Sequence, residues 1–217
     1  TPPGTSLGGP NIQAGNYPAF FINFLILGEY PNEKYGGTNW KCYFEIEIPE
    51  VTTTFKEEDG SETTKPVKVG KIITYSASPR SHLRKLLESW RGKAYASDEE
   101  AKQALVDLKF VGLFGEFTII EKNNRADISG AAPLRQRNRL PEHPYNAPLL
   151  GGWSIEDFET TEAVDKSLDE IGLSPKMKEF ARKSLHYQRL LSGTAQDTNS
   201  QQQDNTSPVE EPDDLPF

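Results

Sequence analysis

The distribution of apolar and polar residues along the first third of the chain predicts three β-strands. Residues 19–27 form a near-continuous apolar run that ends at Gly28, and their aromatic and β-branched content favours a strand buried on both faces. Residues 40–48 alternate apolar with polar side chains, the period of a half-exposed strand, and Pro49 is expected to end it. A third strand is expected over residues 67–75.

Two polar stretches separate these strands. Residues 29–39 include the Gly36-Gly37 pair and are typical of a mobile hairpin loop. Residues 52–65 include Asp59-Gly60 and predict a second loop excursion.

Helical spacing follows the third strand. Leucines recur at helical intervals after Pro79, and Gly92 is expected to end this helix. Residues 97–100, Ser-Asp-Glu-Glu, form a capping box that predicts a short helix over 101–106. Residues 110–121 and 125–133 predict a hairpin that turns at Asn123-Asn124. Three strands, a helical insertion and two strands are the order of a five-stranded OB-fold barrel, and the pattern also fits a five-stranded sheet of another topology.

The second part of the chain is less regular. Residues 135–152 are rich in proline and irregular, and helices are expected over 163–171 and 174–191. Beyond Gly193 the chain has too few apolar residues to offset its conformational entropy. We therefore expect four parts: a flexible arm (1–16), an OB-fold domain (17–153), a helical extension (154–193) and a disordered acidic tail (194–217).

Charge is distributed unevenly among these parts. The net charge of −8 argues against a nucleic-acid partner when the chain is taken as a whole. Residues 1–153, however, hold 18 basic and 18 acidic residues, residues 154–193 hold 6 and 8, and residues 194–217 hold none and 6. The predicted domain is thus balanced in charge, and the tail carries six of the eight net negative charges.

Histidine and acidic residues show no catalytic pattern. His82, His143 and His186 lie in three different segments without metal-ligand spacing, and the sequence has no phosphate-binding glycine loop or nucleophile elbow. Acidic clusters at 57–59 and 98–100 are typical of solvated loops and helix caps. We therefore expect a protein without catalytic residues, metal or cofactor.

The cellular location is predicted from two further features. Cys42 is the single cysteine, which excludes an internal disulfide and indicates a reducing compartment. No stretch approaches the roughly 20 apolar residues of a membrane-spanning helix, and residues 1–15 lack the order of a signal peptide. These features predict a soluble, cytoplasmic protein without a membrane partner.

Binding to single-stranded nucleic acid needs basic residues for the phosphates and aromatic faces for the bases. Two places in the sequence combine both residue types. The first comprises Tyr30, Lys34, Tyr35, Trp40, Lys41 and Tyr43. If Cys42 and Phe44 face the core, Lys41 and Tyr43 point outward together. Two alternatives stay open: Tyr43 packs under residues 52–65, and Trp40, which shares the inward parity, lies at the rim of the core.

The second place has the strongest local excess of positive charge, with six basic residues and Glu88 as the only acid. It comprises Lys71, Tyr75, Arg80, Arg84, Lys85, Trp90, Arg91 and Lys93. On a helix Arg80, Arg84 and Arg91 lie near one another and form a basic stripe. The alternatives are an ordinary solvated face for the stripe and a core position for Trp90. A third, weaker cluster, which covers the barrel or contacts phosphates, comprises Arg135, Arg137 and Arg139.

The last five residues form a distinctive peptide: Asp213, Asp214, Leu215, Pro216 and Phe217. This peptide resembles the acidic tip of bacterial single-stranded-DNA-binding proteins, in which acidic residues precede an aliphatic-Pro-Phe ending. The resemblance implies that the Phe217 side chain fills an apolar pocket on partner proteins while its carboxylate meets a basic residue. Replication, recombination or repair proteins are the partners that it implies.

The body of the chain resembles a group of phage-encoded OB-fold replication proteins. The resemblance rests on residues 45–50 (EIEIPE), 83–94 (LRKLLESWRGKA) and, more weakly, 126–134 (ADISGAAPL), and it spans roughly residues 17–158. It implies an OB fold, binding to single-stranded DNA and a role in phage replication or recombination, in the cytoplasm of a bacterial host. Residues 110–117 are more aromatic than this resemblance leads us to expect.

We expect a protein that coats single-stranded DNA without strong sequence preference and recruits partners through its acidic tip. Two alternatives are a protein-interaction adaptor that has lost DNA binding and a strand-annealing recombination protein. Phe20-Phe21 and the C-terminal helices suit either a core or an interface of a homo-oligomer.

Overall fold

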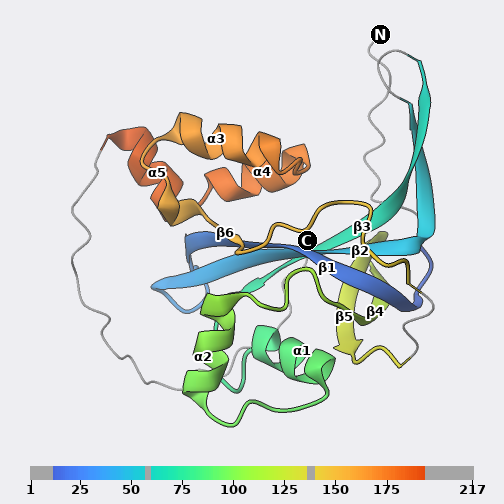
Figure 1. Ribbon diagram of the computed structural model, residues 1–217. Helices are drawn as coiled ribbons and strands as arrows, with labels where there is room; N and C mark the ends of the chain where they lie inside the picture. The colour runs from blue at the N-terminus through green and yellow to red at the C-terminus, as the bar shows by residue number, and fades with distance from the viewer. Residues whose placement is uncertain (1–11, 57–59, 136–139, 194–217) are drawn as a thin grey trace.

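A six-stranded, mainly antiparallel sheet forms the centre of the protein in a computed structural model, which describes residues 12–56, 60–135 and 140–193 (Figure 1). Five strands follow the order β3-β2-β1-β4-β5. They are β1 (Gly15–Pro31), β2 (Thr38–Lys56), β3 (Glu62–Thr74), β4 (Phe114–Lys122) and β5 (Arg125–Ala132). The sixth, β6 (Trp153–Ser154), was not predicted and pairs with β1 in parallel. The prediction of a mainly β fold is confirmed.

The first hairpin is longer than predicted. Gly15 and Asn16, assigned to the flexible arm, already pair with β4. Gly28 does not end the strand: it has φ 85°, and a register shift between Ile26 and Gly28 lets the strand continue as a bulge. Pairing extends to Pro31 opposite Thr38, so the predicted loop of residues 29–39 shrinks to the turn 32–37.

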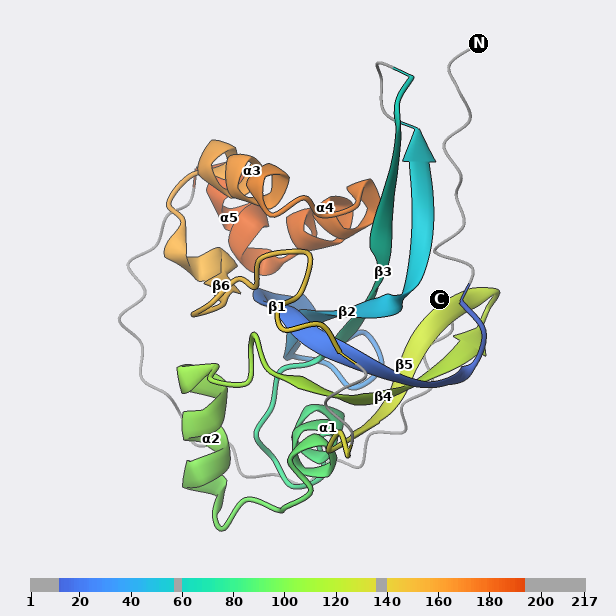
Figure 2. The same ribbon diagram turned by 45° about the vertical axis from the view of Figure 1, so that its right-hand side comes forward.

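A two-stranded ribbon replaces the predicted loop excursion. Pro49 does not end β2, because the register shifts between Ile48 and Thr52 and pairing with β3 then resumes as far as Lys56 opposite Glu62. The ribbon projects away from the rest of the sheet (Figure 2). Residues 57–59 lie outside the described residues.

Helices α1 (His82–Arg91) and α2 (Asp98–Asp107) lie on one side of the sheet (Figure 1). Both begin and end near the predicted positions, with Ser81 and Ser97 as N-caps and Gly92 as the left-handed C-cap of α1. The first core lies between these helices and the sheet. Its largest fully buried side chains include Phe21, Phe24, Phe44, Phe117, Leu83 and Leu87.

The opposite side of the sheet is covered by α3 (Thr161–Glu170), α4 (Pro175–Arg182) and α5 (Leu185–Ser192) (Figure 1). The single helix predicted over residues 174–191 is wrong. It is divided because Ser184 is extended and buried, and its side chain accepts a hydrogen bond from the Tyr187 N–H as the N-cap of α5. The second core lies here and includes Leu25, Leu27, Tyr43, Val164 and Leu168.

Because both sides are covered, β2 is not the half-exposed strand that its alternation predicts. Cys42, Phe44, Ile46 and Ile48 face the first core as expected. The intervening Tyr43, Glu45 and Glu47 are also buried. The Glu47 carboxylate accepts hydrogen bonds from the backbone N–H groups of Tyr145 (2.6 Å) and Asn146 (2.8 Å) and so joins the irregular segment before β6 to the sheet.

The two ends of the strand order approach each other. Lys71 Nζ of β3 donates a hydrogen bond to the Ile128 carbonyl of β5 at 2.7 Å and lies 3.3 Å from an Asp127 carboxylate oxygen. No backbone ladder joins β3 to β5 in the described part of the chain, so the sheet is not closed there and the barrel stays a prediction. Within residues 12–56, 60–135 and 140–193, no helix has the length and apolar character to cross a membrane.

Candidate nucleic-acid interface

Helix α1 positions the basic residues that the sequence singled out. Ser81 accepts a hydrogen bond from the Arg84 N–H at 3.1 Å and fixes the first turn. Leu83 and Leu87 are fully buried and face the first core. This orientation leaves Lys85 exposed on the side of the helix toward β3 and β5.

A groove of about 160 Å³ lies where α1 meets β3 and β5. We call it the basic groove, and its lining residues are Lys71, Ile73, His82, Lys85, Leu86, Ser89, Ile128, Ser129, Gly130 and Ala131. No aspartate or glutamate is among them. Asp127 lies beside Lys71 and compensates part of its charge, whereas Lys85 has an exposed side chain. The groove therefore favours an anionic ligand.

The predicted basic stripe is interrupted at Arg84. This residue is buried, and its guanidinium donates hydrogen bonds to Glu88 (2.9 Å), to Asp98 and to the Ala77 carbonyl (3.0 Å). The hydrogen bond from Arg84, together with the Tyr95 N–H, holds the pKa of Glu88 below its usual value. Arg84 therefore joins α1 to the start of α2 instead of facing solvent.

The other members of the stripe differ in how available they are. Arg91 lies 4.2 Å from the Tyr95 ring centroid and forms an ion pair with Glu100 at 3.2 Å. Arg80, in the turn before α1, and Lys93, after it, are exposed. Arg135 is exposed as well, while Arg137 and Arg139 lie outside the described residues. Lys71, Lys85, Arg80 and Lys93 thus remain as candidates for phosphate contacts.

The first predicted place divides into a buried and an exposed part. Tyr43 points away from the first core as expected, but it is 7% exposed and belongs to the second core. Its hydroxyl donates to Glu45 at 3.0 Å, and its ring lies over Gly70 of β3. Tyr30 stacks on Phe180 with ring centroids 4.7 Å apart. Neither tyrosine presents a free face to a base.

The exposed part lies around the turn 32–37 and its flanking strands. Lys34 Nζ lies 5.0 Å from the Tyr35 ring centroid, and Tyr35 is 44% exposed. Trp40 is half-buried and tilted against Tyr75 at 6.5 Å, which fits the rim position considered for it. Lys41 Nζ donates to Thr74 Oγ1 at 3.0 Å. Tyr35 is the most accessible aromatic of this set.

Trp90 has the core role that was one of its two readings. Its Nε1–H donates to the Phe114 carbonyl at 3.1 Å, and a methyl group at Gly115 would come within 2.3 Å of the indole. The ring is nevertheless half-buried, not fully enclosed.

Comparison with known protein families, with curated proteins and with solved structures finds no match to this chain. The two resemblances, to phage-encoded replication proteins and to the bacterial acidic tip, therefore remain predictions. The tip itself, Asp213 to Phe217, lies outside the described residues, as does the whole predicted tail.

Several groove residues were not predicted as contacts. His82, Ser89 and Ser129 were not among the predicted site residues. The sequence did draw attention to the groove residues on β5, because residues 128–131 fall within the 126–134 segment that supports the resemblance. The residue pattern of the sequence alone does not predict that this segment lies opposite Lys71 and Lys85.

Proposed function

We propose that this protein binds single-stranded DNA without strong sequence preference, and that the phosphate backbone follows the basic groove. The observation that supports this most is the groove itself, which is lined by Lys71, His82 and Lys85 without a carboxylate. Basic grooves of this kind track the backbone of single strands, and exposed aromatics such as Tyr35 stack bases. Arg80 and Lys93 extend the positive charge at the two ends of α1.

The finer architecture that we propose is an OB-type barrel. The strand order β3-β2-β1-β4-β5, with α1 and α2 inserted between β3 and β4, is the order expected of such a barrel. The bond from Lys71 to Ile128 brings the two ends of that order together and supports the proposal. In this arrangement the basic groove lies over the seam between β3 and β5.

A second part of the proposal concerns the acidic peptide at residues 213–217. We expect it to recruit replication, recombination or repair proteins, through the Phe217 side chain and the neighbouring acids. Deleting Phe217 should leave DNA binding intact and abolish recruitment. Removing residues 194–217 should raise DNA affinity at low salt, because six negative charges no longer compete with phosphates for the basic groove.

Fluorescence anisotropy tests the DNA part. Labelled oligo-dT and a duplex of the same length are titrated with the full chain between about 50 and 200 mM salt. We expect preference for the single strand and a slope of log K against log salt of about −3, since each of four phosphate contacts adds about −0.7. The absence of any salt-sensitive preference would contradict DNA binding and leave the adaptor function in its place.

A further inference from the structure

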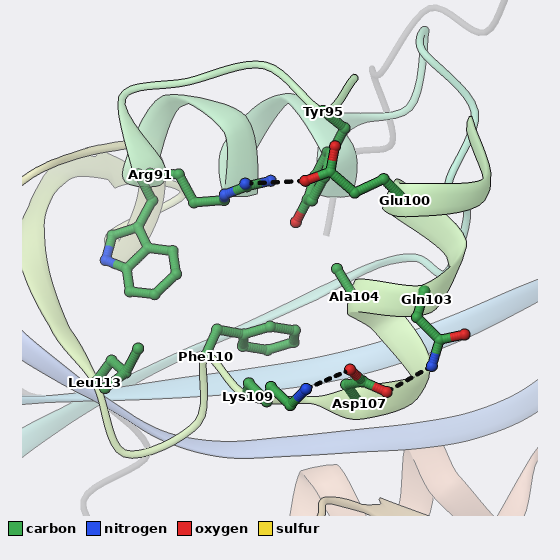
Figure 3. A pocket seen from close by; sticks show the side chains of 10 residues that line it. Arg91, Tyr95, Glu100, Gln103, Ala104, Asp107, Lys109, Phe110 and Leu113 are labelled. Atoms are coloured by element: carbon green, nitrogen blue, oxygen red, sulfur yellow. Dashed lines mark hydrogen bonds and ion pairs between the residues drawn. The ribbon is translucent and has the colours of Figure 1, made fainter. Parts of the chain in front are cut away.

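A second cavity, of about 360 Å³, lies between α1, α2 and the turn before β4 (Figure 3). We call it the aromatic pocket, because Trp90, Tyr95 and Phe110 are in its wall. Figure 3 shows Arg91 and Tyr95 on one side of it and Phe110 and Leu113 on the other. Its volume is within the range of small-ligand sites, roughly 300–1,000 Å³.

The aromatic walls are held in place by the first core. Trp90 lies against Gly115 and is fixed by its hydrogen bond to the Phe114 carbonyl. The Phe110 ring packs edge-on against Phe21 at 5.0 Å and Phe24 at 5.2 Å. Leu113, by contrast, is 48% exposed. The pocket is therefore formed before any ligand arrives, and one of its apolar walls is accessible from solvent.

The charged groups of the aromatic pocket neutralise one another. Arg91 pairs with Glu100 at 3.2 Å, and Lys109 pairs with Asp107 at 2.8 Å (Figure 3). Two cations and two carboxylates leave the lining without net charge. An anion such as a phosphate would have to displace a carboxylate, whereas a flat uncharged group would stack on the half-buried Trp90 ring without breaking either pair.

The aromatic pocket and the basic groove flank the same end of α1. Ser89 lines the groove and Trp90, the next residue, lines the pocket on a different face of the helix. The Ser89 hydroxyl donates to the Ala131 carbonyl at 2.6 Å and holds this end of the helix on β5. Lys93, just beyond this end of the helix, is exposed.

We infer that the aromatic pocket receives one unpaired base of the single strand whose phosphates lie in the basic groove. This inference rests on the proposed function and adds to it a discrete base site outside the sheet. Stacked bases bind with little sequence preference, because every base has a π-face. The arrangement would also discriminate against duplex DNA, whose bases are not free to leave the stack.

Fluorine NMR of the full chain labelled with 5-fluorotryptophan tests the inference directly. The chain has three tryptophans, and the W90F variant assigns the Trp90 signal. We expect oligo-dT to shift the Trp90 signal and an abasic oligomer of the same length to leave it unchanged, although the abasic oligomer also binds. Trp153, buried in the second core, is the internal control and should not shift.

The outcomes separate the two proposals. Binding of both oligomers without a base-dependent shift of Trp90 would overturn the base site and leave DNA binding standing. Failure of both oligomers to bind, judged by anisotropy, would refute the proposed function and the base site with it. A shift caused by the free peptide of residues 213–217 but not by oligo-dT would overturn the inference and make the pocket a peptide site.

A matched pair of variants gives a second measurement. A104L places extra methyl groups in the aromatic pocket, and A163L makes the same change at another half-buried helix position, on α3. We expect A104L to weaken oligo-dT binding roughly 5- to 150-fold, the value of one stacked base, and to leave abasic binding unchanged. A163L should change neither affinity, and equal effects of the two variants would count against the base site.

Discussion

Both sides of the sheet have polar and aromatic side chains, but the helices over them leave these side chains in different environments. Under α1 and α2 the core is apolar and basic residues such as Lys85 remain accessible around its edge. On the opposite side the sheet itself supplies polar groups, Tyr43, Glu45 and Glu47, and all three are buried. Polar and aromatic residues in the sequence therefore indicate an accessible surface only where no other part of the chain covers them in the fold.

The buried polar groups of the second side are fully occupied. Glu45 accepts hydrogen bonds from Asn23 Nδ2 (2.8 Å), the Tyr43 hydroxyl (3.0 Å) and Lys68 Nζ (3.2 Å). Among the described residues, no buried side-chain nitrogen or oxygen lacks a hydrogen-bond partner. The charged groups on this side therefore stabilise the fold through hydrogen bonds, whereas Lys85 on α1 has an exposed side chain.

The largest expected effect tests whether the two cores are equivalent. Leu87→Ala in the first core and Leu168→Ala in the second should each lower the free energy of unfolding by about 2–5 kcal/mol, because both side chains are buried. Chemical denaturation measures this change. Val106→Ala, at an exposed position, is the control and should change the free energy of unfolding by less than about 0.5 kcal/mol. If L168A unfolds only α3 to α5 in a separate transition, the two layers are independent units.

A smaller effect is expected at the polar side of the sheet. Glu47→Ala removes the acceptor for two backbone N–H groups and for Asn146 Nδ2, and should cost about 1–3 kcal/mol. Glu121→Ala, at an exposed position of β4, is the matched control and should be nearly neutral. Equal unfolding midpoints for the two variants would show that Glu47 does not hold the segment before β6.

Acid should weaken the α1 side through Glu88. The folded-state pKa of Glu88 lies below its ordinary value of 4.5, mainly because of the hydrogen bond from Arg84. A lowered pKa means that its stabilisation is present above about pH 4.5 and is lost as the pH falls through the folded-state value. Denaturation across this range should show a shallower acid loss for Glu88→Gln than for the unaltered chain. If the stability of both proteins falls with pH in parallel, Glu88 does not contribute to the acid sensitivity.

The smallest effect concerns the accessible charge. Lys85→Ala should reduce the salt slope of oligo-dT binding by about 0.7, the contribution of one phosphate contact. Lys166→Ala on α3 removes the same charge from the other helical layer, where its side chain is 79% exposed. That variant should leave the slope unchanged. A similar loss in both would mean that DNA responds to net charge and not to the groove.

Local signals in the sequence predicted many elements correctly. The capping box at Ser97 starts α2, and Asn123 and Asn124 form the expected turn with φ values of 53° and 58°. Gly28 and Pro49 were wrong as strand ends, because a bulge admits either residue within a continuing strand. Such bulges depend on the partner strand, which a single-strand pattern does not include.

The candidate site was harder to predict because its environment comes from distant segments. Tyr43 is buried by helices more than a hundred residues later in the chain, and Arg84 is drawn inward by Asp98 on the next helix. The basic groove likewise combines Lys71, Lys85 and residues 128–131. Composition identified the region around α1 as rich in basic residues, but only the packing showed which of its cations remain accessible.

The ribbon formed by the outer parts of β2 and β3 has a consequence for solubility. Beyond Pro49, the described part of β2 pairs with β3 alone, which leaves backbone N–H and C=O groups along an open edge. Such edges are templates for pairing between molecules. Glu62 and Lys65 lie on this ribbon, and charged side chains on an exposed edge disfavour edge-to-edge aggregation.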